Sequence, residues 1–283
     1  ISNLFIAGKT STKFTNLFAK DGASVLNLSL VARNAINSTI QNVNIENIEY
    51  ELELEKGLGS IYVAGLVAYM EGGSISGCIV ENFAVKFVDS NKNGTENVSS
   101  STTYIGGLVA KAVNKVTIEN CSIYDLKLQQ TKLQTVAFYV GGVAGHTTVK
   151  NGNTERSLIK NINVGETETD NEELLKVREG MIVSEMVAKY FGGIVGLSEY
   201  VNIENCSTVV DYALNEHKYE TNIGGIVGVS NNTTITSVEV YIKLGIKSFT
   251  SRNNDQFIGA VAGRLNSYSA INGYVVNAEI ITT

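Results

Sequence analysis

Tyr104-Ile-Gly-Gly-Leu-Val-Ala110 is the stretch that decides the fold of this 283-residue chain. Its pattern is an aromatic residue, an apolar residue, two small residues and an apolar run. The other copies are Tyr62–Ala68, Tyr139–Gly145, Tyr190–Gly196, Asn222–Gly228 and Phe257–Gly263. Because a unit repeated every few tens of residues buries its apolar face only by stacking on its neighbours, this phrase predicts a solenoid.

The residues that follow the phrase read as short β-strands. In Val116–Leu128 apolar and polar residues alternate, which is the period of a strand. The alternation changes phase near Asn120 and Cys121, which indicates a corner. One repeat therefore predicts three short strands wound into one coil. Because parallel crossovers are right-handed, we expect an all-β fold, a right-handed parallel β-helix or β-solenoid of about seven to eight coils.

The chain is expected to form one solenoid domain over residues 1–283, with degenerate coils in about residues 1–60 and clear repeats in 61–283. The phrase recurs at unequal intervals, so the extra residues of the longer repeats must leave the coils as loops. The predicted extruded segments are 89–103, 129–137, 147–156, 165–188 and 247–256. All except 147–156 are expected at one corner, and Glu172–Arg178 is compatible with one or two helical turns.

Two sets of residues recur at equivalent places in the repeats. The second small residue of the phrase is Gly65, Gly107, Gly142, Gly193, Gly225 or, in the last copy, Ala260. Glycine there allows a kink or a close approach of coils, and the apolar residues that follow exclude a phosphate loop. Cys78, Cys121 and Cys206 follow the phrase at nearly the same distance in their repeats, so we expect buried small side chains rather than disulfides.

Stacking also predicts columns of like side chains. An aromatic column, broken by Asn222, contains Tyr62, Tyr104, Tyr139, Tyr190 and Phe257. It is either a structural ladder or an exposed stripe that stacks against sugars. A ladder of amide hydrogen bonds is predicted at a corner for Asn42, Asn120, Asn161 and Asn205.

Composition and charge exclude several classes of function. The net charge is −6 and no face is basic, which excludes a nucleic-acid partner. No apolar run is long enough to span a membrane, so we expect no direct membrane insertion. The two histidines, His146 and His217, lie far apart in the sequence, and only Asp125 and Asp211 suggest an acid pair. We therefore expect no catalytic residues.

One segment matches the opening of a calcium-binding loop. In Asp89-Ser-Asn91-Lys-Asn93-Gly94 oxygen ligands alternate along the chain, and the glycine allows the sharp turn. The twelfth position is Ser100, so the bidentate acid of such loops is missing. The segment also reads as an ordinary polar loop. We therefore expect no cofactor and no metal, and a calcium ion held by Asp89, Asn91 and Asn93 is the alternative.

The phrase Tyr104–Ala110 and the following Val-Thr-Ile-Glu-Asn-Cys-Ser-Ile of residues 116–123 resemble the GLUG-type repeat of bacterial surface proteins. The resemblance spans about Asn16–Ile280, and it brings no catalytic residues. It implies a non-catalytic adhesin or stalk, at the bacterial cell surface or secreted. The implied partner is a host or matrix glycan or protein, or another domain of the same protein.

Two alternatives stay open beside the adhesin. The first is an accessory β-helical domain of a secreted or wall-attached metalloprotease, although the zinc motif His-Glu-x-x-His is absent from this chain. The second is a polysaccharide-active β-helix enzyme. Since the chain begins at Ile1 without an initiator methionine, we expect it to be a fragment of a longer surface protein. The insertions 89–103 and 165–188 have no binding role that the resemblance predicts.

Overall fold

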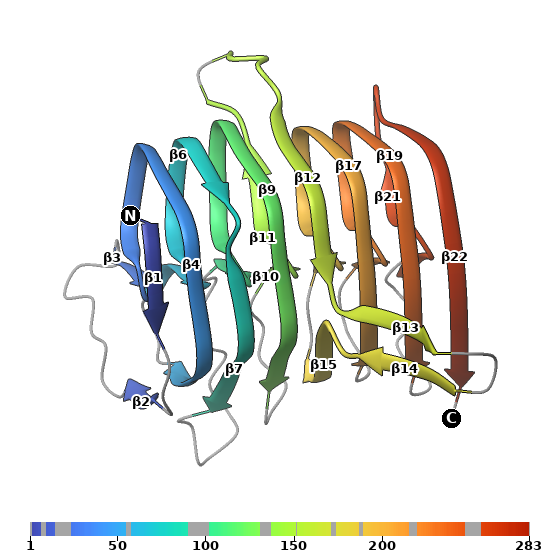
Figure 1. Ribbon diagram of the computed structural model, residues 1–283, viewed down its shortest axis with the longest axis horizontal. Helices are drawn as coiled ribbons and strands as arrows, with labels where there is room; N and C mark the ends of the chain where they lie inside the picture. Colours follow the sequence, from blue (N-terminus) through green and yellow to red (C-terminus); the bar gives the residue numbers. More distant parts are fainter. Residues whose placement is uncertain are drawn as a thin grey trace.

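The computed structural model describes residues 2–6, 10–14, 24–54, 58–89, 102–130, 137–150, 152–170, 174–186, 189–214, 220–246 and 256–282. These residues form β-strands and no helix, so none of them belongs to a helix that could cross a membrane. All paired strands run parallel except those of one hairpin. The prediction of an all-β chain with parallel sheets is confirmed (Figure 1).

Seven strands that carry the repeated phrase, or its degenerate first copy, form one sheet in the order of the chain. They are β3 (Ser24–Leu28), β5 (Leu58–Ala64), β8 (Thr102–Gly106), β10 (Ala137–Gly141), β16 (Tyr190–Gly192), β18 (Thr221–Gly224) and β20 (Gln256–Gly259). Tyr104 pairs with Tyr62 on one side and Tyr139 on the other. We call each such strand, with the strands that follow it, a coil. The first to seventh coils are residues 24–54, 58–89, 102–130, 137–186, 189–214, 220–246 and 256–282.

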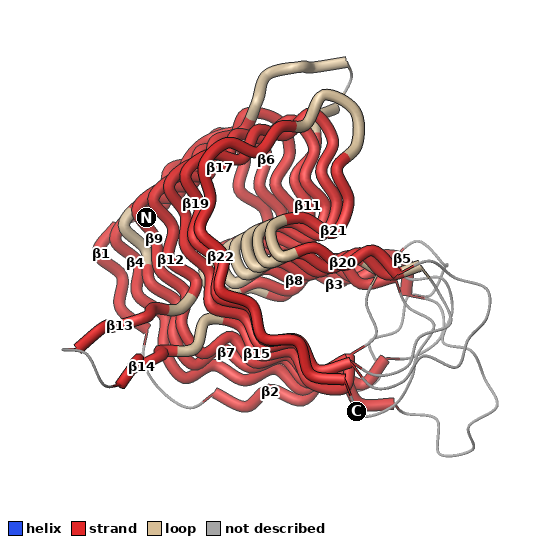
Figure 2. Tube along the Cα trace, turned by 90° about the vertical axis from the view of Figure 1, so that its right-hand side faces the viewer, coloured by secondary structure: helices blue, strands red, loops and turns tan. Residues whose placement is uncertain are grey.

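Apart from a two-stranded hairpin in the fourth coil, the rest of each coil belongs to a 13-stranded sheet. Its long strands are β4 (Ala32–Leu54), β9 (Val109–Gln130), β17 (Val195–Leu214) and β19 (Val227–Ile246). Its shorter strands are β1 (Ser2–Ile6), β2 (Thr10–Phe14), β6 (Val67–Ser76), β7 (Ile79–Asp89), β11 (Ala144–Thr148), β12 (Ser157–Val164), β15 (Met181–Met186), β21 (Ala262–Leu265) and β22 (Ala270–Thr282). β17 and β19 pair in one register along their whole length, so residue lies over residue in successive coils (Figure 2).

The long strands bend where a residue adopts the left-handed conformation. In β9 these residues are Asn114 (φ 62°), Asn120 (φ 55°) and Asp125 (φ 53°), of types that tolerate positive φ better than most. The corner that the change of phase predicts near Asn120 is one of these bends. The predicted three strands per coil occur in the second coil (β5, β6, β7) and the seventh (β20, β21, β22), whereas in the third coil the residues after β8 form one 22-residue strand, β9.

The phrase glycines lie one above another where the chain turns from one sheet into the other. The Gly107 N–H donates to the Gly142 carbonyl at 2.8 Å, and a Cβ on Gly107 would lie 2.3 Å from that oxygen. None of these glycines has a positive φ, so the close approach of the coils, rather than the backbone conformation, excludes a side chain. The first coil has Leu30 at this place and the last coil has Ala260.

The apolar core runs through the inside of the coils, and the cysteines occupy one column of it. Cys78, Cys121 and Cys206 are buried and free, and Ile162 and Val238 hold the same position in other coils. The three thiols donate to the carbonyl two residues earlier at 3.3, 3.2 and 3.2 Å. Burial raises the pKa of Cys206 to about 12, so this thiol stays protonated and packs as a small apolar group.

The insertion in the fourth coil differs from its prediction. A hairpin of β13 (Glu166–Asp170) and β14 (Leu174–Arg178) leaves the coil there and projects from the body (Figure 2). Residues Leu174–Arg178 are thus a strand rather than helical turns. β15, which the sequence assigned to the same loop, returns to the sheet between β9 and β17.

The hairpin also leaves at a different corner from the one predicted for residues 165–188. The Gly165 N–H donates to the Ile123 carbonyl at 2.8 Å, and the Leu126 N–H donates to the Gly180 carbonyl at 2.9 Å. The hairpin therefore starts beside the Asp125 bend of the third coil, before the last segment of the fourth. Because the hairpin leaves at this bend, β15 stays in the sheet, although the sequence pattern assigns its residues to a loop.

The other predicted extruded segments contain residues that the structure does not describe. Residues 90–101, 131–136 and 247–255 are outside the described residues, and so is most of segments 89–103, 129–137 and 247–256. Segment 147–156 leaves between β11 and β12. Lys150 holds it to earlier coils, because its Nζ donates to Glu71 Oε2 at 2.9 Å and its N–H donates to Asn114 Oδ1 at 3.0 Å.

Candidate functional site

Asparagine side chains form a hydrogen-bonded ladder on the outer surface of the coils. Asn161 Nδ2 donates to Asn120 Oδ1 at 2.9 Å, and Asn205 Nδ2 donates to Asn161 Oδ1 at 2.8 Å. All three residues are left-handed, with φ of 55°, 53° and 50° in chain order, so one bend repeats through three coils. Gly77 holds this position in the second coil, which separates Asn42 of the first coil from the ladder.

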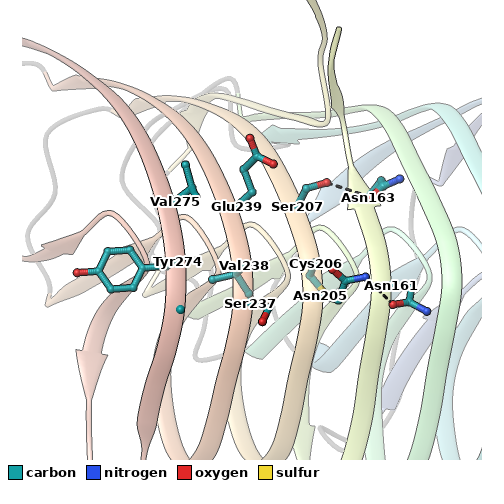
Figure 3. Close-up of a pocket in the computed structure, with 11 residues that line it drawn as sticks. Asn161, Asn163, Asn205, Cys206, Ser207, Ser237, Val238, Glu239, Tyr274 and Val275 are labelled. Atoms are coloured by element: carbon teal, nitrogen blue, oxygen red, sulfur yellow. Dashed lines mark hydrogen bonds between the residues drawn. The ribbon is translucent and has the colours of Figure 1, made fainter. Parts of the chain in front are cut away.

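After Asn205 the residues at the same position in the next two coils have smaller side chains, Ser237 and then Gly273. The loss of side-chain volume leaves a shallow groove of about 680 Å³ across the fourth to seventh coils. We call it the asparagine groove; it is lined by Asn161, Asn163, Asn205, Cys206, Ser207, Ser237, Val238, Glu239, Gly273, Tyr274 and Val275. Figure 3 shows these side chains in two rows that cross neighbouring strands.

The groove is polar along most of its length and apolar at its C-terminal end. Ser207 Oγ donates to Asn163 Oδ1 at 3.0 Å, and the exposed Glu239 is the one charged side chain among the described lining residues. Tyr274 is 62% exposed and Val275 is 58% exposed. Tyr274 occupies the column that the buried Cys206 and Val238 occupy in earlier coils, so in the last coil this position presents an aromatic ring to solvent.

The tyrosine column of the phrase lies elsewhere and has a structural role. Tyr104 stacks on Tyr62 with ring centroids 4.9 Å apart, on Tyr139 at 4.9 Å and on His146 at 5.7 Å. Lys111 Nζ lies 5.0 Å from the centroid of the Tyr104 ring. Neighbouring groups therefore occupy the ring faces that a sugar would need, which favours the structural ladder over the sugar-stacking stripe.

His146 is buried between this column and a glutamate. The bond between its Nε2 and Glu199 Oε2 is 3.1 Å long. Burial lowers the pKa of His146, against the opposite effect of Glu199, and Lys111 lowers it further. The same hydrogen bond holds the pKa of Glu199 below its usual range. The arrangement is a neutral imidazole that donates to a carboxylate, which ties the fourth coil to the fifth.

Acidification is expected to destabilise the chain through His146. Because the folded pKa lies below the unfolded value of about 6.5, protons bind preferentially to the unfolded chain. The stabilisation is complete above about pH 6.5 and is lost as the pH falls toward the folded pKa. Urea midpoints between pH 7.5 and 5 should therefore decrease, and His146→Asn should show a smaller slope over this range. An equal slope in both proteins would contradict the assignment.

Asp125 and Asp211 do not form the acid pair of a glycosidase. Asp211 aligns with Ile182 in the fourth coil and, through it, with Lys127 in the third. The Cα atoms of the two acids are therefore two coils apart, about 9.6 Å along the stack by the sheet spacing, with a further offset of two residues along the strand. This backbone separation is greater than the ~6.5–9.5 Å between the carboxyl groups of inverting enzymes. Lys127 Nζ lies 3.9 Å from Asp125 Oδ1 instead.

The calcium candidates are mostly beyond the description. Asp89 is the last residue of β7, whereas Asn91 and Asn93 lie outside the described residues, as does His217. In the described part of the chain, three or more His, Cys, Asp or Glu side chains nowhere gather in a way that could hold a metal ion. The calcium site stays an alternative interpretation of the sequence.

The residues that distinguish the asparagine groove were not singled out by the sequence. Asn161 and Asn205 were predicted only as members of a structural ladder, and Ser207, Glu239 and Tyr274 were not considered. One signal was present: in the last repeat a tyrosine follows Asn272-Gly273 where earlier repeats have cysteine, isoleucine or valine. An aromatic residue at a position that is otherwise cysteine or aliphatic marks a coil whose surface differs from the rest.

Comparisons with known proteins add no family to these observations. No protein-family model, no curated protein and no solved structure matches the chain. The resemblance to the GLUG-type repeat therefore rests on the repeated phrase and on the strand that follows it. The chain is an all-β protein of parallel strands, and its lateral surface carries the asparagine groove.

Proposed function

We propose that this chain is a right-handed parallel β-solenoid segment of a GLUG-type bacterial surface protein, displayed at the cell surface or secreted. It is a non-catalytic adhesin or stalk segment that binds a host or matrix glycan or protein. The observation that carries the proposal is the stacking of successive coils in one register.

Stacked coils can form a rigid stalk whose outer side chains differ from coil to coil. Each coil contacts its neighbours through paired strands, so a change on the outer face of one coil leaves the core of the others in place. The column that runs from Asn161 through Asn205 and Ser237 to Gly273 illustrates this, because the strands on both sides keep their register while the outer side chain changes. Asp125 and Asp211 lie two coils apart rather than side by side, which favours binding over hydrolysis by a glycosidase acid pair.

The test is a binding screen of the purified chain on arrays of glycans and of extracellular-matrix proteins. We expect saturable binding to at least one of these ligands. A variant in which residues 167–177 are replaced by a two-glycine link should keep the fold, because β13 and β14 pair only with each other, and Arg178 and Glu179 keep their contacts with Glu81, Tyr124 and Asp125. Circular dichroism and the unfolding midpoint check the fold of that variant. If neither array binds the folded wild-type chain, the proposal is wrong.

A further inference from the structure

We infer that the asparagine groove binds an uncharged oligosaccharide whose chain lies along the stack of coils. The inference rests on the proposed function, and it names the binding site and the chemical class of the ligand. Four features of the groove support it: its length, its amide groups, its lack of positive charge and its aromatic end.

The groove is long enough for several sugar units and is open to solvent. Its lining residues come from four successive coils, which corresponds to a length of about 14 Å by the sheet spacing. Its volume is about 680 Å³, within the usual range for ligand sites. Asn205 and Ser237 are exposed, so the floor of the groove is accessible along the stack. An extended chain, rather than a single compact molecule, fits this shape.

The amides offer the donors and acceptors that sugar hydroxyl groups need. An asparagine side chain has two N–H donors and an oxygen with two lone pairs. In the ladder Asn161 Nδ2 gives a hydrogen to Asn120 Oδ1, and Asn161 Oδ1 receives one from Asn205, so a donor and a lone pair of Asn161 are left over. The ladder also fixes the orientation of these amides, which lowers the entropy lost when a ligand binds.

The charge of the groove selects against acidic ligands. No lysine, arginine or histidine is among its described lining residues, and Glu239 contributes one exposed carboxylate. A sulfated or sialylated glycan would place like charges near Glu239 without a cation to offset them. Neutral hexoses and N-acetylated sugars carry no such penalty.

The aromatic end supplies an apolar surface for one sugar ring. Sugars have apolar faces of C–H groups, and tyrosine combines an apolar ring with a polar tip. Tyr274 is 62% exposed, and in Figure 3 its ring points away from the other labelled side chains, past the edge of β22. A sugar unit that extends past β22 would thus stack on Tyr274, while the amides bind hydroxyl groups of the preceding units.

The experiment measures the binding of the full chain to defined probes. The neutral probes are hexasaccharides of glucose, mannose, galactose and N-acetylglucosamine, and the acidic probes are sulfated and sialylated oligosaccharides. We expect micromolar to millimolar binding to a neutral probe by calorimetry. Asn205→Ala should weaken it about fivefold and Tyr274→Ala about tenfold, whereas Tyr274→Phe should keep most of the affinity. Glu239→Gln should improve the binding of the acidic probes.

Asn82→Ala is the matched control, because Asn82 is likewise a left-handed asparagine that donates to an asparagine of the adjacent coil, Asn47, but neither residue lines the groove. It should leave the affinity unchanged, and unfolding midpoints verify that every variant is folded. If a neutral probe binds but Asn205→Ala and Tyr274→Ala bind it equally well, the inference fails and the proposed function stands. Binding to acidic probes or matrix proteins alone has the same consequence. If the folded chain binds nothing, both fail.

Discussion

Alanine in place of Gly142 is expected to lower the free energy of unfolding by more than about 3 kcal/mol. A Cβ at this position would lie 2.2 Å from the Gly193 carbonyl oxygen and 2.8 Å from a methyl group of Val164. The coils cannot move apart to relieve the overlap without loss of the hydrogen bond from the Gly142 N–H to the Gly193 carbonyl, now 3.0 Å long. Overpacking alone costs about 1–3 kcal/mol, and here a backbone hydrogen bond is lost as well.

Urea or guanidinium unfolding measures this effect, and Gly245→Ala is the matched control. A Cβ on Gly245 would meet its nearest atoms at 3.7 and 3.9 Å, which is ordinary contact, and Gly245 has no positive φ. The control should change the free energy of unfolding by less than about 0.5 kcal/mol. Equal denaturation midpoints for Gly142→Ala and the wild-type chain would show that the close approach of the coils does not explain the glycine column.

Phe138→Ala should have the second large effect, a loss of about 3–5 kcal/mol. Phe138 lies on the inward face of β10 and is fully buried, and its ring meets that of Phe87 at 4.9 Å and an angle of 69°. Removal of this ring leaves a cavity between the phrase sheet and the end of the long sheet. The coils above and below are fixed by their backbone pairing, so they can close the cavity only in part.

The same variant tests whether the loss is local. Because stability in stacked repeats depends on neighbouring units, and the Phe138 ring contacts Phe87 of the second coil, amide protection from hydrogen exchange should decrease most in the second to fifth coils. Tyr268→Ala, at a residue that is 84% exposed, serves as the control and should change stability by less than about 0.5 kcal/mol. A uniform loss of protection from the first to the last coil in Phe138→Ala would argue for a globally cooperative fold instead.

The stacking of the coils could be predicted from the sequence because in-register pairing places equivalent residues of successive repeats next to one another. The distance from the phrase to the cysteine fixes Cys78 over Cys121, and the pairing of Ile79 with Ser122 shows that registry. The amide ladder through Asn161 and Asn205 follows from the same argument. In each case one residue type recurs at one distance from the phrase, which is a signal that a single sequence contains.

The hairpin could not be predicted in the same way. Its neighbour β15 pairs with β9 and β17 and supplies the buried Met181 and Val183, yet the whole hairpin separates Met181 from the end of β12 at Val164. Nothing in a short stretch such as Met181–Met186 tells whether it belongs to a loop or to the stack. That choice depends on pairing with strands of the adjacent coils, which lie far away in the chain, since Met181 pairs with Leu126 and with Val210.

The asparagine groove escaped prediction for a related reason. It arises from the difference between coils, as side chains shorten from Asn205 to Ser237 to Gly273 and a cysteine position becomes Tyr274. Repeats are recognised by the residues that their copies share, whereas this groove lies where the residues differ from copy to copy. The two interpretations of the aromatic column likewise required the ring distances around Tyr104.

The fourth coil suggests how such a chain changes length over evolutionary time. Its neighbours carry the same pentapeptide, Ile-Glu-Asn-Cys-Ser, at 118–122 and at 203–207, whereas the fourth coil has Ile-Lys-Asn-Ile-Asn at 159–163 between them. Since β12 pairs with both flanking strands at matching positions, excision of one whole unit would bring two already compatible edges together. Unequal recombination between repeats can therefore lengthen or shorten the protein by complete turns without a new packing problem.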